Sequence, residues 1–330
     1  MNGRAEPHTS LDPRLSWRAA AAADLEGWAA LIARTAAVER PVWFERRADL
    51  EQVLGSQKNP AATNTVLGTD VEGVARAYAR ITKNPEGDKA VGYGCVDPGW
   101  QRKGIGHGLL GWMEGRARLR FAEDGRAGTT PRLRLHSEQQ HTHQAALFGS
   151  AGYRIVRYYH EMHRPLQGGL PEVVLDERFE LVGFGPELRG PVRLAHNDAF
   201  QDHWGSEPRD EEGWGLVVND PLARPDLSAV VLERATGKVA GYQLASHDPV
   251  TAASRGFTEG YTDLLGVRRE FRGRGVARAL LADAMHRFAA AGMETASLDV
   301  DSENPTGALA LYATMGYAAV NSSMAWDKEV

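Results

Sequence analysis

The segment of the sequence that decides the fold is Leu264–Phe288, which reads LLGVRREFRGRGVARALLADAMHRF. Its apolar start ends at Val267, and the polar, glycine-containing residues 268–274 follow as a turn. Apolar residues then recur with the spacing of one face of an amphipathic helix, at Ala277, Leu280, Leu281, Ala284, Met285 and Phe288. The segment therefore predicts a strand, a turn and a helix in close succession.

The turn has the features of an anion-binding site. Gly273 and Gly275 leave room for a ligand close to the backbone. The first N–H groups of a helix have no partner within the helix and lie at the positive end of its dipole. Together these features favour a pyrophosphate ligand. The spacing lacks both G-x-x-x-x-G-K-[ST] and G-x-G-x-x-G, which excludes a nucleotide-hydrolase phosphate loop and makes a dinucleotide-binding fold an unsuitable interpretation.

The same pattern occurs twice in the chain. Gln101-x-x-Gly104-x-Gly106 follows an apolar strand that ends at Val96, and Gly104 lies 171 residues before Gly275, from the positions 104 and 275. Ala146-Leu147-Phe148-x-x-x-Gly152-Tyr153 matches Ala310-Leu311-Tyr312-x-x-x-Gly316-Tyr317 at an offset of 164 residues, from the positions 148 and 312. Two ordered motifs at nearly constant offset indicate an internal duplication.

Arg272-x-x-Gly275-x-Ala277 resembles the acyl-CoA signature R/Q-x-x-G-x-G/A of the GNAT family of N-acetyltransferases. The resemblance covers nearly the whole chain, because each half reads approximately β-α-α-β-β-β-α-β-α-β, the order of that fold. It implies an α/β fold with a mixed sheet and two tandem domains. We expect an N-terminal domain at 1–165, either degenerate or regulatory, and a catalytic C-terminal domain at 172–330. Residues 164–171, RPLQGGLP, suit a linker.

The resemblance also implies that acetyl-CoA is the co-substrate and which residues would hold it. The strand ending at Val267 is expected to separate from its neighbour, so that backbone groups of Leu265 and Val267 meet the pantetheine and the thioester. The expected cofactor-binding residues in the second half are Leu265, Val267, Arg272, Gly273, Arg274, Gly275, Val276, Ala277 and Asn304. In the first half they are Val96, Gln101, Arg102, Gly104 and Gly106. Asn304 followed by Pro305 also suits the start of a helix, with Asn304 as its cap.

Tyr312 matches the tyrosine that serves as general acid in many family members, and its phenol is protonated at neutral pH. A core tyrosine on a helical stripe is the other interpretation. The first copy has Phe148 at this position, which cannot donate a proton, so we expect catalysis in the second half.

Three residues are candidates for the general base: Glu259, at the spacing of a glutamate base in several family members, Asp263 and His203. Each also has a structural interpretation, and a base acting through ordered water remains an alternative.

Composition narrows the class of protein. The chain has 330 residues, a formal net charge of −5 and a pI of about 6.1, so no nucleic-acid partner is indicated. Its single cysteine, Cys95, fits a reducing cytosol. We expect neither a signal peptide nor a membrane-spanning segment, and therefore a cytoplasmic protein. His136, His141 and His143 are not spaced like a zinc motif, and no metal is expected.

The sequence thus predicts an enzyme that moves an acetyl group from acetyl-CoA to a primary amine of a small metabolite or antibiotic-like molecule. The expected partner is that small-molecule acceptor, without nucleic acid or membrane, and the expected state is a monomer or homodimer. Two alternatives stay open: a non-catalytic acyl-CoA-binding sensor or assembly module, and catalysis in the N-terminal domain. Fold alone does not decide the acceptor.

Overall fold

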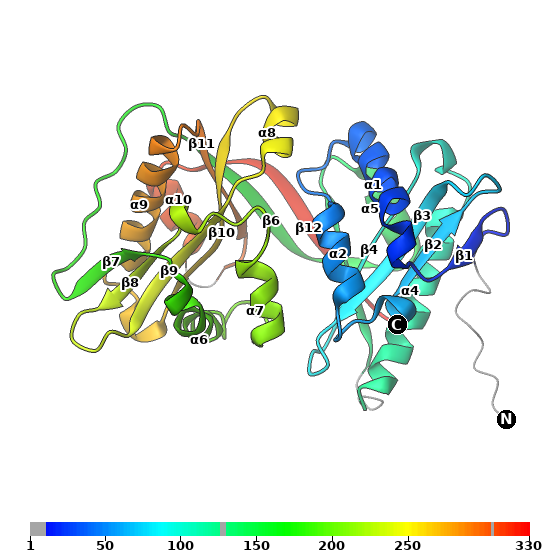
Figure 1. Cartoon of the computed structure of the whole chain (residues 1–330), viewed down its shortest axis with the longest axis horizontal. Coiled ribbons are helices and arrows are strands. Elements are labelled where there is room, and N and C mark those ends of the chain that lie inside the picture. The colour runs from blue at the N-terminus through cyan, green and yellow to red at the C-terminus, as the bar shows by residue number, and fades with distance from the viewer. Residues whose placement is uncertain (1–10, 126–129, 305–306) are drawn as a thin grey trace. The chain divides into compact units, whose positions relative to one another are not determined.

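The structure is a computed structural model, and it describes residues 11–125, 130–304 and 307–330. The chain divides into two compact units, which are considered separately (Figure 1). Unit 1 comprises Met1–Arg157 and Ser323–Val330, and unit 2 comprises Tyr158–Ser322. Within the described ranges, no helix is both long enough and apolar enough to cross a membrane.

Unit 1 is a mixed sheet with the strand order β1-β2-β3-β4-β5-β12, in which only the β4–β5 pair is parallel. The strands are β1 (Ser16–Arg18), β2 (Thr65–Thr69), β3 (Ala75–Lys83), β4 (Ala90–Val96), β5 (Arg132–Glu138) and β12 (Ala318–Glu329). The helices are α1 (Leu25–Glu39), α2 (Arg47–Gly55), α3 (Ala61–Asn64), α4 (Ile105–Glu123) and α5 (Thr142–Ser150).

Unit 2 repeats this plan with the strand order β7-β8-β9-β10-β11-β6, in which only the β10–β11 pair is parallel. The strands are β7 (Phe179–Gly183), β8 (Ala229–Glu233), β9 (Val239–Ser246), β10 (Glu259–Val267), β11 (Thr295–Asp301) and β6 (Arg154–Pro165). The helices are α6 (Arg189–Ala199), α7 (Glu211–Val218), α8 (Pro249–Arg255), α9 (Val276–Ala290) and α10 (Ala308–Thr314).

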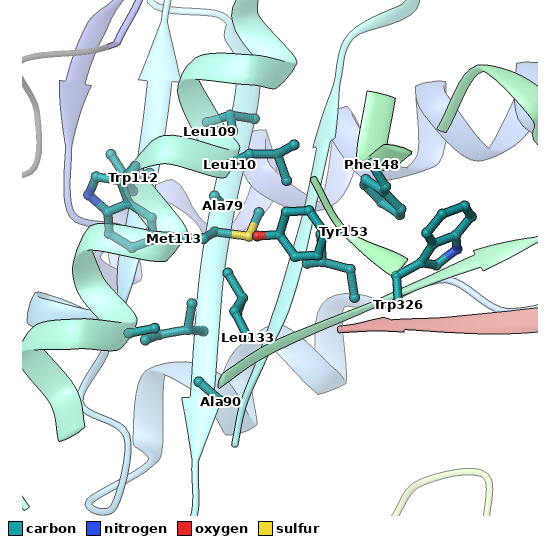
Figure 2. Packing of buried hydrophobic residues seen from close by; sticks show 14 of the residues in the cluster. Ala79, Ala90, Leu109, Leu110, Trp112, Met113, Leu133, Phe148, Tyr153 and Trp326 are labelled. Carbon is teal, nitrogen blue, oxygen red and sulfur yellow. The ribbon is translucent and has the colours of Figure 1, made fainter. Parts of the chain in front are cut away.

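The last strand of each half of the sequence pairs with strands of the other half. Strand β6 ends the first half and joins the sheet of unit 2, whereas β12 ends the second half and joins the sheet of unit 1. Residues Ser323–Glu329 of β12 pair antiparallel with β5, and Tyr159–Pro165 of β6 pair antiparallel with β11. Figure 2 shows Trp326 of β12 beside Phe148, with ring centroids 5.9 Å apart in the core of unit 1. This division differs from the domain limits expected at 165 and 172, because a contiguous sequence pattern carries no sign of an exchanged strand.

Helix α9 covers one face of the unit 2 sheet, and glycines in the strands allow it to lie close. A Cβ atom at Gly260 would stand 2.3 Å from Phe288, and one at Gly241 would stand 2.7 Å from Val276. The opposite face carries α6, because Tyr242 and Leu244 of β9 pack with Val192 and Trp214. Residues of β10 that do not face α9 therefore point to the α6 face.

The predicted strand that ends at Val96 is β4, and the predicted strand, turn and helix of Leu264–Phe288 are the end of β10, the following turn and most of α9. Helix α8 lies between β9 and β10, where the predicted order has no helix. The expected cap at Asn304 is wrong: α10 begins at Ala308, with Gly307 in the N-cap position at φ 75°. Pro305, expected at the first helical position, lies outside the described residues.

Replacing Trp326 with Ala should destabilise the protein by about 3–5 kcal/mol, because a large core side chain is removed and a cavity is left. The change also removes the hydrogen bond from Trp326 Nε1 to Ser137 Oγ, 2.9 Å long. The free energy of unfolding in urea measures the effect. Val320→Ala, at an exposed position of the same strand, is the control and should change stability by less than about 0.5 kcal/mol. Equal effects of the two changes would contradict the exchanged strand.

Candidate active site

Strand β10 is paired with β11 over only the first part of its length. Its parallel pairing with β11 runs from Glu259↔Thr295 to Thr262↔Leu298, whereas its antiparallel pairing with β9 continues to Val267↔Gly241. The N–H of Arg268 donates to the carbonyl of Ala240 in β9 at 3.0 Å. Since successive residues of a strand direct their backbone groups to alternate sides, those of Leu265 and Val267 point away from β9. Their amide and carbonyl groups therefore face the side on which β11 has separated.

A β-bulge lies where the two strands part. Thr262 pairs with Ala245 and Leu264 pairs with Leu244, so Asp263 is the extra residue of β10. The hydroxyl of Ser246 donates to Asp263 Oδ1 at 2.9 Å. The side chain of Asp263 is exposed to solvent, although protein atoms lie close around its carboxylate. This partial desolvation, opposed by the Ser246 hydrogen bond, raises the pKa of Asp263 to about 7.

The turn after β10 has the left-handed backbone conformations that its glycines permit. Gly273 has φ 74° and Gly275, the N-cap of α9, has φ 78°, a region in which other residues are strained. A Cβ atom placed on either glycine would meet no atom within 4 Å, so the space over the turn is open. The N–H groups of Val276 and Ala277 begin a helix of 15 residues and lie at its positive end. Open space over unpaired amides fits a phosphate group.

Arg272 stabilises this turn through its side chain. Its Nε donates to the carbonyl of Val267 at 3.3 Å, and its Nη2 donates to the carbonyl of Ala199 at the end of α6, at 2.8 Å. The guanidinium thus ties the turn to β10 and α6. Arg274 is exposed, and its Cζ lies 6.0 Å from the ring centroid of Phe271.

Unit 1 contains the same turn. Arg102 has φ 60°, Gly104 is the N-cap of α4 at φ 86°, and Gln101 Nε2 donates to the carbonyl of Val96 at 3.3 Å and to Glu39 Oε1 at 2.8 Å. Gln101 therefore repeats the contacts of Arg272, with the strand end and with the preceding helix. The β4–β5 pairing includes only Ala90↔Leu133 and Val91↔Arg134, so these strands also separate. The predicted duplication is confirmed at the level of backbone conformation.

Tyr312 lies on α10 in the same apolar cluster as Leu265, with its ring centroid 6.0 Å from that of Tyr317. Burial raises the pKa of Tyr312 to about 12, so the phenol stays protonated at neutral pH. Phe148 and Tyr153 repeat this ring pair in unit 1 at 6.1 Å. The structure is therefore compatible with both interpretations of Tyr312, as core residue and as proton donor.

Glu259 lies in a buried ionic network. Arg255 Nη1 is 3.1 Å from Glu259 Oε1 and 2.7 Å from Glu161 Oε1, and His163 Nε2 is 2.7 Å from Glu161 Oε1. The ligand atoms of Glu161, His163 and Glu259 are close enough to one another to hold a metal ion, but Arg255 already supplies the positive charge between them. The carboxylate of Glu259 thus has an ion-pair partner, which Asp263 lacks among the described residues.

Polar residues that the sequence analysis missed surround this part of the α6 face. Glu161 and His163 come from β6, Arg255 comes from α8, and Tyr261 of β10 forms a hydrogen bond with Asp299 of β11. Polar residues two positions apart in β6 were the one available signal, since they lie on one face of a strand. Nothing in the sequence indicated that β6 lies beside β11.

The other candidates lie elsewhere. His203 follows the end of α6, with its ring centroid 5.3 Å from that of Phe200. Asn304 donates its backbone N–H to the carbonyl of Asp301 at 3.1 Å, and its carbonyl accepts from Gly307 at 3.3 Å, in the turn before α10.

The corresponding face of unit 1 is filled by its own side chains. Arg80 Nε lies 2.6 Å from Glu45 Oε1, and its Cζ lies 3.8 Å from the ring centroid of Tyr93. The Tyr78 hydroxyl donates to the other oxygen of Glu45. Unit 1 pairs β3 with β4 without a register shift, so it has no residue equivalent to Asp263.

Comparison with known proteins agrees with this geometry. Residues 191–317 match the model of the Acetyltransferase (GNAT) family. The chain is 29% identical to the mycothiol acetyltransferase of Thermomonospora curvata over 253 residues, which are 74% of this chain and 76% of that protein. It is also 29% identical to the mycothiol acetyltransferase of Salinispora arenicola over 277 residues, 78% of this chain and 79% of that protein.

Two solved structures share the fold over almost the whole chain. A GCN5-related N-acetyltransferase from Sphaerobacter thermophilus has a TM-score of 0.71 at 25% identity, over 97% of this chain and 96% of that chain. A tandem GNAT protein from the clavulanic acid biosynthesis pathway has a TM-score of 0.69 at 17% identity, over 96% and 98%. Residues 191–317 are therefore an acetyltransferase domain of the GNAT family, in a chain that has the tandem GNAT fold.

Proposed function

We propose that unit 2 transfers the acetyl group of acetyl-CoA to a primary amine of a small metabolite. The observation that carries this proposal is the position of Asp263. It is the extra residue of a bulge, its pKa is raised to about 7, and it adjoins the backbone groups of Leu265 and Val267 that have no strand partner. A carboxylate with such a pKa exchanges protons readily at neutral pH.

In this proposal the pyrophosphate of CoA binds the open turn at Gly273–Ala277, and the pantetheine lies along Leu265 and Val267. Asp263 accepts a proton from the acceptor ammonium. The free amine attacks the thioester carbon and a C–N bond forms. When the tetrahedral intermediate collapses the C–S bond breaks, and the proton that the nitrogen then loses restores the phenol of Tyr312 after it has protonated the thiolate. The amide of Leu265 is directed toward the opening and would stabilise the oxyanion, while the phenol of Tyr312 would protonate the departing thiolate.

Unit 1 supports a binding role without catalysis. It keeps the turn, with Gly104 open to solvent, but has Phe148 in place of Tyr312 and lacks the bulge carboxylate. Its corresponding face is occupied by the Glu45–Arg80 pair. We therefore place CoA in both units and acetyl transfer in unit 2 alone, which argues against a pure sensor and against N-terminal catalysis.

Asp263→Asn should lower kcat/KM by about 10²–10⁴-fold, the usual contribution of a general base. Because the pKa of Asp263 lies near 7, wild-type activity should rise with pH through that value as the carboxylate loses its proton. The variant should lack this inflection. Acetylation of a panel of amines, measured as CoA release between pH 5.5 and 8.5, provides the profile. Asp283→Asn on the outer side of α9, where the carboxylate pairs with Arg287, is the control. An unchanged inflection in Asp263→Asn would remove Asp263 from the mechanism.

Tyr312→Phe should lower turnover about ten-fold or more, the low end for a positioned acid, without weakening CoA binding. Phe148 shows that a phenylalanine is accommodated at the corresponding position of unit 1. Turnover and CoA affinity measured on the same preparation separate the two effects. Full activity would leave Tyr312 as a core residue only.

Calorimetry should give two CoA molecules per chain. Gly275→Ala should reduce this number to one and abolish transfer, because a Cβ atom would enter the open space over the turn. Gly104→Ala should also reduce the number to one, with turnover retained. Gly237→Ala is the matched control: its φ of 69° imposes similar strain in a turn between β8 and β9, and both sites should persist. A single wild-type site would show that the turn of unit 1 does not bind CoA.

A further inference from the structure

Arg209 lies in the connection between α6 and α7, and its backbone is held on two sides. Its N–H donates to Asn197 Oδ1 at 2.9 Å. Its carbonyl accepts from Asn197 Nδ2 at 3.0 Å and from Arg193 Nη1 at 3.3 Å. Both partners belong to α6, so the position from which the Arg209 side chain extends is fixed by the helix.

The guanidinium of Arg209 has no anionic partner among the residues that the structure describes. Across residues 11–125, 130–304 and 307–330, no carboxylate lies within ion-pair distance of it and no acceptor forms a hydrogen bond with it. The nearby acidic Glu211 lies instead 3.7 Å from Arg193 Nη2. Protein atoms nevertheless surround the group, and this burial lowers the pKa of Arg209 from its ordinary value. An arginine offers five N–H donors, and those of Arg209 keep contact with solvent, so a ligand can reach them.

Besides the cationic Arg193, the groups next to Arg209 on α6 and β9 are the uncharged His196 and Tyr242. Tyr242 is fully buried, and its hydroxyl lies 2.6 Å from Nδ1 of His196. Burial, and then the charge of Arg209, lower the pKa of His196 to about 4, so this imidazole is neutral at pH 7. Neither His196 nor Tyr242 supplies a negative charge to Arg209.

This location adjoins the proposed reaction site. A Cβ atom on Gly266 would stand 2.8 Å from the Tyr242 hydroxyl, so Tyr242 touches β10 one residue from Leu265. Asp263 and the Glu161–Arg255–Glu259 network lie further along the same face. The face thus presents carboxylates at one end and a free guanidinium at the other.

We propose that Arg209 binds an oxyanion of the acceptor, a carboxylate or a phosphate, while the acceptor amine is held at Asp263. The acceptor class is then an amine that also carries an anionic group. Guanidinium binds both kinds of oxyanion through paired, charge-assisted hydrogen bonds. This inference rests on the proposed function, because that function identifies the bound molecule as the acceptor. The ability of Arg209 to bind an anion does not depend on the proposed function.

Two matched pairs of acceptors test the proposal with the full-length chain and acetyl-CoA. One pair is an α-amino acid and its amide, and the other is an amino sugar phosphate and its unphosphorylated form. The wild-type enzyme should favour the anionic member of one pair by ten-fold or more in kcat/KM. The pair that shows this preference identifies the bound anion as a carboxylate or a phosphate. Arg209→Gln should abolish the preference by raising KM, without changing CoA affinity. Arg209→Lys should retain part of it.

Arg189→Gln is the control, because Arg189 is a half-buried residue of α6 whose hydrogen bond to Asn219 Oδ1, 3.1 Å long, is exposed to solvent. It should keep the full preference. Transfer to neutral and anionic amines at equal rates would overturn the anion site and leave the proposed function intact.

A second measurement does not depend on turnover. With CoA saturating, inorganic phosphate and acetate are titrated against the wild type and Arg209→Gln, and the melting temperature is recorded. Stabilisation of the wild type by one of the anions, absent in Arg209→Gln and present in Arg189→Gln, supports the site even if no amine is acetylated. Equal responses of wild type and Arg209→Gln would overturn it.

Discussion

The geometry of the candidate site depends on the end of the backbone hydrogen bonding between β10 and β11. Strand β10 keeps its pairing with β9 to Val267 but leaves β11 after Thr262. A strand buried on both sides would have no free amide for a substrate, and a strand free on both sides would not hold its position. One-sided pairing gives rigid, unsatisfied donors, and such groups bind a ligand with little reorganisation.

The bulge residue Asp263 lies at the point where β10 and β11 separate. A bulge increases the local twist and redirects a side chain, so the point at which the strands part also carries the carboxylate. The carboxylate occupies a place where solvent enters but protein atoms predominate, which accounts for its raised pKa. Glu259, four residues earlier on the same strand, is neutralised by Arg255 instead. The two acidic residues of this strand therefore differ from each other because different residues surround them.

The two units show that nearly the same backbone can carry different side chains on the face beside the glycine turn. Arg102 and Gly273 share the left-handed conformation, and Gln101 and Arg272 share their carbonyl contacts. Side chains alone fill the face of unit 1, where Arg80 and Glu45 are buried together. Replacing such a pair by an open pocket would leave charges without partners, so the filled state is locally stable.

Local patterns predicted the turn at Gly275, the helix after it and most strands, because these depend on spacing and backbone freedom within a few residues. The bulge was not predictable, since Asp263 differs from a regular strand residue only through its pairing with β9. Helix α8, which brings Arg255 to Glu259, was missed because its seven residues carry little periodicity. The partners of Glu259 on β6 depend on long-range pairing that the sequence does not encode locally.

The exchanged strands β6 and β12 have a consequence for the integrity of the molecule. A single peptide-bond break in the stretch 166–175 would produce two fragments, each of which contains a strand that completes the other's sheet. Such fragments would remain joined as a nicked, native-like protein until denatured. Neither half, expressed alone, would possess all six strands of its sheet. Each copy therefore needs the last strand of the other copy to complete its sheet.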